Sequence, residues 1–364
     1  MGHTLGEISF KKMKFAPIIL FACKRPDLTL NCLNCLKRNK EFEESLLFVY
    51  IDKTLEDIDK YLETIEIIKQ NAPSNARIII SDVHQGSPIA IPKAITEVLN
   101  EFDKVIVIED DLFLSNFFLK FMNDGLNKYQ YDLNVGAIHG YLYPLDLLKY
   151  DKDTFFVHDP GSLGWGTWKR SWELFEKDAS KSISYIKEHK LKKKFNNGYP
   201  FFKRLKKVKN KKIKCWDVKW RATFYIHDLL TLYPSHSLVR HDGNRPDATN
   251  HFTNKDWLYT NVYQKPIKVE NIDVIDNVII ENQFKKFLYN NAEMRTIDKI
   301  KNKLTPKISI ILFSVLLFIS IFFLSKLPAI YLKENPLIGI LIMFTIFVSS
   351  FFIFVNVDKI KNKS

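Results

Sequence analysis

Short apolar runs alternate with amphipathic helical patterns over the first third of the chain. Runs rich in aliphatic and β-branched residues predict buried strands at 16–23, 46–52, 76–82 and 105–108. Between them, apolar residues recur at helical spacing and predict helices at about 27–36, 55–70 and 90–100. Strands separated by helices form βαβ units, so the pattern predicts an α/β fold with a Rossmann-like, mostly parallel sheet flanked by helices.

Charged side chains stand at the end of each predicted strand. In a parallel α/β sheet, ligands bind beyond the carboxyl ends of the strands, so we expect these side chains to line one cleft. Mg²⁺ and Mn²⁺ prefer oxygen ligands, and a cation would relieve the repulsion between neighbouring carboxylates. A metal–nucleotide site is therefore predicted, with a solvated loop end as the alternative. The residues concerned are Arg25, Asp52, Asp82, Glu109, Asp110 and Asp111.

Two uncharged, Phe-rich stretches near the C-terminus predict a transmembrane helical hairpin, at about 308–327 and 337–357. Lys and Arg flank the pair on both outer sides, so the positive-inside rule predicts that both termini are cytoplasmic. Buried core helices are the alternative. We expect no signal peptide, because the apolar stretch at 15–23 is short and contains Pro17.

Basic residues dominate the charge of the chain, whose net charge is +13, and twelve Lys and Arg lie between 190 and 214. Nucleic acid is one partner for such a run, but the predicted hairpin favours anionic lipid headgroups or a phosphorylated acceptor, with no nucleic acid. A solvated surface is the alternative. The four cysteines are too few for a disulfide framework, and Cys32 and Cys35 are expected to be buried on one helix face.

Five motifs follow one another along the chain in this order: F-A-C-K-R-P, Y-I-D, V-I-V-I-E-D-D-L, G-S-L-G-W-G-T-W and W-D-V-K-W-R. Together they resemble nucleotide-sugar-dependent glycosyltransferases of the GT-A fold. The similarity is to a bacterial sugar transferase group called hemolytic-protein-like and, more distantly, to N-acetylglucosaminyltransferase I. It covers about 16–250 and not the predicted hairpin.

The resemblance implies roles for the residues at the strand ends. Arg25 and Asp52 would contact the nucleoside, with Asp52 accepting from the base, and Asp82 is counted with them as donor-binding. Asp110 would lie near the ribose or behind the metal. Asp111 would be the direct ligand of Mn²⁺ or Mg²⁺, and the metal would bridge the donor diphosphate.

The glycine-flanked Trp165 and its neighbour Gly164 are predicted to contact the donor sugar or the acceptor, since aromatic faces suit the C–H faces of sugar rings. The alternative is a turn followed by a helix whose tryptophans anchor the core. We expect that core role for Trp172.

An inverting transfer needs a carboxylate base, and the resemblance places Asp217 there. The motif departs from the W-D-D-W-like pattern of the eukaryotic relatives, so Asp228 is a possible substitute, and a helix N-terminal role is the alternative for Asp217. In the polar stretch 240–252, His241 or His251 could ligate a metal, and Arg245 could hold phosphate.

The expected organisation is an N-terminal extension (1–14), a glycosyltransferase domain (15–275), a basic juxtamembrane linker (276–307), the hairpin (308–357) and a basic cytoplasmic tail (358–364). We expect a multi-pass protein of the inner membrane with its catalytic domain in the cytoplasm. It would transfer a hexosyl or N-acetylhexosaminyl group from a UDP- or GDP-linked sugar to a cell-surface glycan or lipid-linked precursor. Alternatives are a polyprenyl-phosphate glycosyltransferase, a nucleotidyltransferase, disfavoured by the missing G-x-G-x-x-G loop, and a catalytically degenerate membrane assembly partner.

Overall fold

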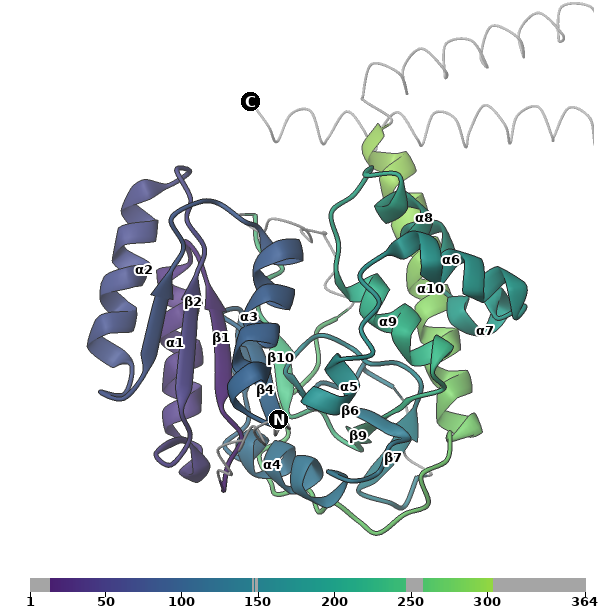
Figure 1. Ribbon diagram of the computed structural model, residues 1–364, viewed down its shortest axis with the longest axis horizontal. Coiled ribbons are helices and arrows are strands. Elements are labelled where there is room, and N and C mark those ends of the chain that lie inside the picture. Colours follow the sequence, from purple (N-terminus) through teal and green to yellow (C-terminus); the bar gives the residue numbers. More distant parts are fainter. Residues whose placement is uncertain (1–13, 146, 148–149, 247–257, 304–364) are drawn as a thin grey trace, which may run out of the picture. The chain divides into compact units, whose positions relative to one another are not determined.

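A mixed sheet forms the centre of the fold (Figure 1), in a computed structural model that describes residues 14–145, 147, 150–246 and 258–303. The sheet has eight strands in the order β3-β2-β1-β4-β8-β6-β9-β7. A separate antiparallel pair is formed by β5 (Leu112–Leu114) and β10 (Val239–His241). The eight strands are β1 (Ile18–Ala22), β2 (Leu47–Ile51), β3 (Arg77–Ile80), β4 (Lys104–Glu109), β6 (Val135–His139), β7 (Thr154–Val157), β8 (Trp165–Trp168) and β9 (Leu230–Pro234).

The first four strands of the large sheet are parallel. β1 pairs with β2 and β4, and β2 pairs with β3, which confirms the four strands predicted from the apolar runs. β8 lies antiparallel between β4 and β6, so β6 and its parallel partner β9 run in the same direction as β4. β7 is antiparallel to β9, so β7 ends at the edge where β4 begins.

Helices connect the strands and cover both faces of the sheet. The three helices predicted between the first four strands are present as α1, α2 and α3. The helices are α1 (Pro26–Lys37), a 3₁₀ turn (Lys40–Phe42), α2 (Ile58–Asn71), α3 (Ser87–Glu101), α4 (Phe118–Lys128), α5 (Lys169–Trp172), α6 (Ala179–Glu188), α7 (Lys192–Asn196), α8 (Phe201–Lys209), α9 (Asp217–Ile226) and α10 (Val278–Lys303).

Successive side chains of a strand point to opposite faces of the sheet, so the core is divided into one cluster on each face. Ile106 and Ile108 of β4 pack in a cluster with α1, α2 and α4. Val105 and Val107 of the same strand pack in a second cluster with α3, α6, α8 and α9. β4 is therefore buried on both faces, which explains its continuous apolar sequence. As expected, Cys32 and Cys35 are buried in α1.

Residues 1–291 form one compact unit and 292–364 a second, of which the structure describes only 292–303. α10 begins at Val278, inside the segment predicted as a linker, and its Ile280 and Phe284 are buried against β7 and β9. None of the described helices combines the length and apolarity needed to cross a membrane. Both predicted spans lie outside the described residues.

Candidate functional site

The carboxyl ends of β1, β2, β3 and β4 meet at one edge of the sheet, because these strands are parallel. Each is followed by charged side chains predicted as site residues. The backbone N–H of Asp52 donates to the Ala22 carbonyl at 3.1 Å, and that of Asp110 donates to the Phe21 carbonyl at 2.9 Å. The ends of β2 and β4 are thus fixed on either side of the end of β1, where Arg25 follows.

Arg25 holds the two aspartates that follow β4. Its Nη1 donates to Asp111 Oδ2 at 2.8 Å, and its Nη2 forms a close ion pair with Asp110 Oδ1. Arg25 directly precedes α1, which begins with Pro26, so its backbone is fixed by the helix start. The Asp110 side chain is 1% exposed and the Asp111 side chain 10% exposed, so both carboxylates are largely shielded from water. Three of the strand-end residues predicted from sequence, Arg25, Asp110 and Asp111, therefore form one charged cluster, here called the Arg25 cluster.

His241 joins the cluster through the pairing of β5 with β10. β5 follows directly after Asp111, and its Leu112 pairs with His241. His241 Nε2 lies 3.5 Å from Asp111 Oδ2. Gly243 follows closely, and a Cβ there would lie 2.3 Å from Asp111 Oδ2 and 2.8 Å from His241 Nε2. A glycine at 243 avoids these close contacts and leaves the two side chains in their present positions.

The three acids of the E-D-D motif differ in their protonation. Burial, and then the charge of Asp111, raise the pKa of Glu109 to about 8. Burial also raises the pKa of Asp110 to about 6, although Arg25 opposes this. Burial acts in the same direction on Asp111, but His241 and Arg25 outweigh it and hold the pKa of Asp111 below its ordinary range. Asp111 is therefore the acid of the three that stays ionised most readily.

The donor set of this cluster fits a divalent cation. Asp111 supplies an ionised carboxylate and His241 an imidazole nitrogen beside it, a combination suited to Mn²⁺ and other transition metals. Arg25 donates to the same carboxylate oxygen, so a cation bound there would share or take over the position of the guanidinium. His251, the other histidine predicted as a possible ligand, lies outside the described residues. Arg245 pairs with Asp27 in α1.

Asp52 fixes the loop that leads from β3 into α3. Its carboxylate accepts hydrogen bonds from the backbone N–H groups of Gln85 at 2.8 Å and Gly86 at 2.7 Å, and His84 Nδ1 lies 3.1 Å away. Asp82 lies exposed at the start of this loop. Asp52 thus has a structural role, because it holds the loop before α3 at the carboxyl edge of the sheet. Its contact with a nucleoside stays a prediction.

Trp165 belongs to the core and offers no face to a sugar. Its exposed fraction is 0%, and its ring lies 5.7 Å from Trp216, 5.8 Å from Trp220 and 6.2 Å from Trp172, centroid to centroid. The prediction that Trp165 contacts a sugar is therefore corrected, because partners distant in sequence enclose it. The core role expected for Trp172 is confirmed.

Gly164 has a packing role. Its φ is +67°, and a Cβ there would lie 2.9 Å from Val239 and 3.3 Å from Phe118. Its carbonyl accepts a hydrogen bond from the backbone N–H of Gly140 at 2.7 Å. The hydrogen bond joins the segment before β8 to the end of β6, and a contact of Gly164 with a sugar stays a prediction.

Asp217 and Asp228, the two candidate bases, lie at opposite ends of α9. Trp216 stacks on Trp165, which pairs with Val107 near the carboxyl end of β4, so Asp217 begins α9 on the side of the Arg25 cluster. Asp228 lies two residues before β9, which runs parallel to β6, and so lies at the opposite edge of the sheet. The geometry therefore favours Asp217 over Asp228. Cys215 donates to the Asp217 carboxylate, and Arg204 Nη2 lies 3.7 Å from it.

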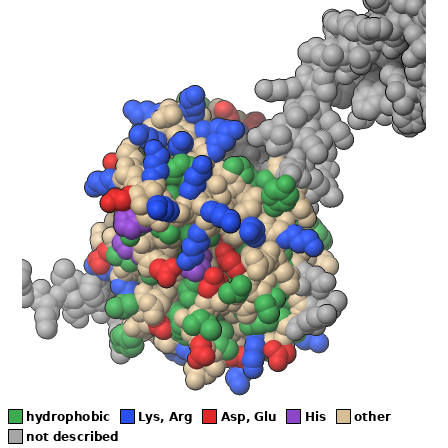
Figure 2. Space-filling model, turned by 90° about the vertical axis from the view of Figure 1, so that its right-hand side faces the viewer, with side chains coloured by type: hydrophobic (Ala, Val, Ile, Leu, Met, Phe, Trp, Pro, Cys, Tyr) green, Lys and Arg blue, Asp and Glu red, His purple; other side chains and the backbone are tan. Residues whose placement is uncertain are grey.

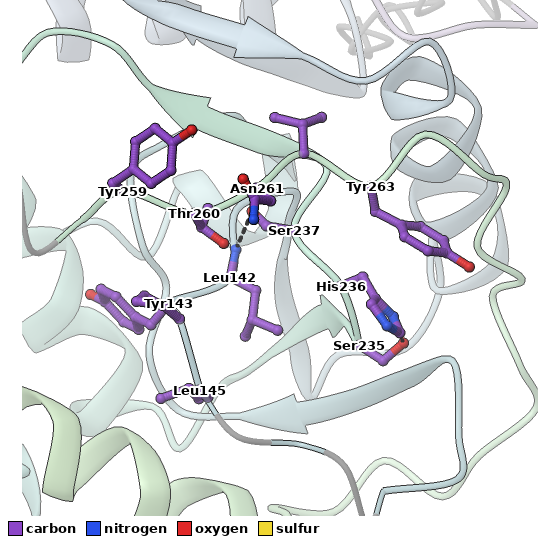
Figure 3. Close-up of a pocket in the computed structure, with 12 residues that line it drawn as sticks. Leu142, Tyr143, Leu145, Ser235, His236, Ser237, Tyr259, Thr260, Asn261 and Tyr263 are labelled. Atoms are coloured by element: carbon purple, nitrogen blue, oxygen red, sulfur yellow. Dashed lines mark hydrogen bonds between the residues drawn. The ribbon is translucent and has the colours of Figure 1, made fainter.

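A hollow of about 380 Å³ opens at the same carboxyl edge, beyond the ends of β6 and β9 (Figure 3). Its lining residues include Tyr143, Tyr259, Tyr263, Ser235 and Thr260, residue types that often contact sugars. The hydrogen bond from the Leu142 N–H to Ser237 Oγ, 2.9 Å long, joins two of its walls. Sequence analysis missed this hollow, because its walls come from three separate segments with no common motif.

No protein-family model matches the sequence, and no curated protein is significantly similar to it. Solved structures give weak matches. Glucosyl-3-phosphoglycerate synthase from Mycobacterium tuberculosis, in complex with Mn²⁺, UDP and glucosyl-3-phosphoglycerate, matches at 12% identity and a TM-score of 0.31, over 44% of this chain and 58% of that chain. A candidate nucleotide-diphospho-sugar transferase from Desulfovibrio desulfuricans G20 matches at 12% identity and a TM-score of 0.30, over 46% and 69%. At such TM-scores the matches carry no functional conclusion, which has to come from the site itself.

Proposed function

We propose that this chain is a metal-dependent glycosyltransferase that moves a sugar from a UDP- or GDP-linked donor to a glycan or lipid-linked acceptor. The observation that carries the proposal is the Arg25 cluster: a guanidinium, two buried aspartates and an imidazole at the carboxyl edge of a parallel sheet. This edge is where such sheets bind nucleotides. The order of the five sequence motifs adds the resemblance to GT-A enzymes.

Asp111 and His241 would hold Mn²⁺ or Mg²⁺ in this account. The ion would supply charge neutralisation for the nucleoside diphosphate as it leaves the sugar. Asp111 suits the role because its Oδ2 lies 3.5 Å from His241 Nε2 and Gly243 leaves room beside both atoms. Arg25 would turn from Asp111 towards the donor phosphates, and Asp110 would face the ribose.

Asp217 would take the proton from the acceptor hydroxyl, which makes the transfer inverting. It stands at the first residue of α9, and the Trp165–Trp216 stack fixes that end of the helix. The nearby Arg204 and Cys215 hold its carboxylate in place. Asp228 is separated from Asp217 by the length of α9, roughly 15 Å at 1.5 Å per residue.

Membrane attachment at the cytoplasmic face of the inner membrane is supported by the sequence of the two predicted spans and by the basic surface. Figure 2 shows Lys and Arg side chains gathered on the side of the molecule that carries α6, α7 and α8. Exposed lysines there include Lys203, Lys206 and Lys207 of α8. Such a surface suits anionic lipid headgroups or a phosphorylated lipid-linked acceptor.

The direct test is a donor-turnover assay on the detergent-purified full chain with a panel of UDP- and GDP-sugars and Mn²⁺. We expect release of UDP or GDP with at least one donor, and loss of more than 99% of that activity in Asp111→Asn. The matched control is Asp124→Asn, an exposed aspartate on α4 paired with Lys120 at 2.7 Å, which should keep full activity. Equal turnover in Asp111→Asn and wild type would refute the metal assignment. A parallel assay with polyprenyl phosphate as the acceptor, followed by mass spectrometry of the product, distinguishes transfer to polyprenyl phosphate itself from transfer to a glycan or a lipid-linked glycan.

A further inference from the structure

A second cluster of ligand-type side chains lies at the other end of the sheet from the Arg25 cluster. His158 follows β7, and Asp276 and Glu281 lie at the start of α10. Candidate ligand atoms of these three residues all lie within 4.8 Å of one another. β7 is four strands from β4 in the sheet order, or about 19 Å at the usual strand spacing. β7 also ends at the edge opposite to Asp111, so the two clusters are separate.

The two ring nitrogens of His158 face different partners. Nε2 lies 2.9 Å from Asp228 Oδ1, a contact that is favourable when Nε2 carries the proton, and 3.1 Å from Lys194 Nζ, which pairs with the same Asp228 oxygen. Nδ1 lies 3.3 Å from Asp276 Oδ2 but makes no hydrogen bond of good geometry. The His158 side chain is only 5% exposed, so water does not readily solvate Nδ1. A buried nitrogen lone pair that points at a carboxylate needs a positive charge between them.

Two carboxylate oxygens in the cluster lack donors as well. Asp276 Oδ1 and Glu281 Oε2 are buried atoms without a hydrogen-bond partner, while Glu281 Oε1 accepts from Asn197 Nδ2 at 2.7 Å. A proton on His158 Nδ1 would satisfy only one of the oxygens that face it. A cation at the centre of the cluster would satisfy His158, Asp276 and Glu281 together.

The neighbouring basic side chains already have partners. Arg221 Nη1 lies 2.7 Å from Asp159 Oδ2, and Lys194 Nζ lies 2.9 Å from Asp228 Oδ1. Within the part of the chain that the structure describes, neither Asp276 nor Glu281 forms an ion pair with Lys or Arg. Among the described Lys, Arg and His side chains, only His158 lies within ion-pair distance of these two acids.

We propose that His158, Asp276 and Glu281 bind a divalent transition-metal ion such as Zn²⁺, distinct from the metal of the Arg25 cluster. One imidazole and two carboxylates form a usual donor set for such ions, with water in the remaining positions. Asp228 completes the arrangement, because a carboxylate that accepts the other ring N–H of a ligand histidine fixes its tautomer.

The proposed ion has a structural role. It joins the end of β7 to the first turn of α10, a junction also held by the Asn277 N–H, which donates to the Phe156 carbonyl at 2.9 Å. Metal binding at a preformed folded site stabilises the fold by mass action. The proposed metal site does not depend on the glycosyltransferase activity. If no metal binds at His158, Asp276 and Glu281, the proposed glycosyltransferase function is unaffected.

The test is zinc binding by the tag-free, detergent-purified full chain in the Asp111→Asn background, which removes the main ligand of the other site. Protein stripped with EDTA is dialysed against Zn²⁺, desalted and measured by inductively coupled plasma mass spectrometry. We expect about one equivalent of zinc and a higher melting temperature than in the metal-free protein. Adding His158→Gln or Glu281→Gln should remove the bound zinc, whereas Glu188→Gln, an exposed acid on α6, should not.

Circular dichroism of each variant establishes that it is folded, and the two ligand variants provide independent checks. Co²⁺ in place of Zn²⁺ adds a visible absorption band that should disappear with His158→Gln. Zinc retained in full by both ligand variants would overturn the proposal. So would no zinc in the Asp111→Asn protein, an outcome that would make His158 an imidazolium between Asp228 and Asp276.

Discussion

Arg25 and Asp111, 86 residues apart in the sequence, form an ion pair with an Nη1–Oδ2 distance of 2.8 Å at the carboxyl edge of the sheet. Arg25 also pairs with Asp110, so one guanidinium compensates two buried acids. The same oxygen of Asp111 that accepts from Arg25 faces His241. Arg25 therefore occupies the position against Asp111 that a bound cation would share or take over.

Replacing Arg25 by Gln should destabilise the fold, and Mn²⁺ should restore much of the loss. Removal of one partner leaves Asp110 and Asp111 uncompensated, at a cost of about 3 kcal/mol for largely buried groups. Because Mn²⁺ no longer has to displace a guanidinium, it should raise the melting temperature of Arg25→Gln more than that of wild type.

The control is Arg77→Gln, which breaks an exposed ion pair with Glu101 and should cost less than about 1 kcal/mol with no Mn²⁺ dependence. An Arg25→Gln protein whose melting temperature does not respond to Mn²⁺ would contradict the assignment of a cation site at Asp111.

Asp217→Asn should lower kcat at least 100-fold without weakening donor binding, because a general base contributes about 10²–10⁴ in rate. Asp228→Asn is the matched variant at the other end of α9 and should keep most of the activity. Steady-state kinetics with a donor found active, together with donor titration by calorimetry, separates kcat from binding. The reverse ranking of the two variants would assign the base to Asp228.

The fold should become less stable as the pH falls from 6.5 towards 4, in part because of His139. Its Nδ1 contacts the Tyr141 carbonyl at 2.8 Å, and its Nε2 accepts from the Leu163 N–H at 3.2 Å, so the buried ring is neutral. Burial lowers the pKa of His139 to about 4, so below pH 6.5 the unfolded chain binds a proton that the folded chain does not.

The expected loss from this group between pH 7 and pH 5 is about 2 kcal/mol. It is measured as the difference in pH dependence of the melting temperature between wild type and His139→Gln. His236→Gln, at an exposed histidine, should show the wild-type dependence. Identical pH profiles for wild type and His139→Gln would show that His139 does not contribute.

The basic face of α8 should bind anionic lipid. Substituting Lys203, Lys206 and Lys207 together by Gln should weaken binding of the full chain to phosphatidylglycerol nanodiscs on the order of 100-fold, at about 1 kcal/mol per lysine. Binding to phosphatidylcholine nanodiscs should not change. The control variant carries Gln at Lys37, Lys60 and Lys69, which are exposed on α1 and α2. Equal losses in both triple variants would indicate a net-charge effect and not a lipid-binding face.

The sequence predicts the first half of the sheet well, because β-branched apolar runs and helical periodicity alternate without ambiguity up to residue 109. It also predicts that the charged residues after these strands gather at one edge, since parallel strands impose that placement. The partners within the edge are a tertiary property. Neither the Arg25–Asp111 pair nor the position of His241 beside Asp111 can be deduced from local pattern.

The role of Trp165 shows the opposite case, in which a local pattern misleads. A tryptophan between glycines resembles an exposed binding platform, but Trp172, Trp216 and Trp220 close over it. The cluster of His158, Asp276 and Glu281 could not be found from the sequence either, because His158 lies more than a hundred residues before the two acids and the three share no motif.

The most direct test of the central claim is calorimetric titration of the full chain with UDP- and GDP-sugars, in Mn²⁺ and in EDTA. The account predicts that at least one nucleotide sugar binds with Mn²⁺, that EDTA weakens this binding at least tenfold, and that Asp111→Asn removes the metal dependence. Absence of binding by every nucleotide sugar in Mn²⁺, or the same affinity with and without metal, would contradict it.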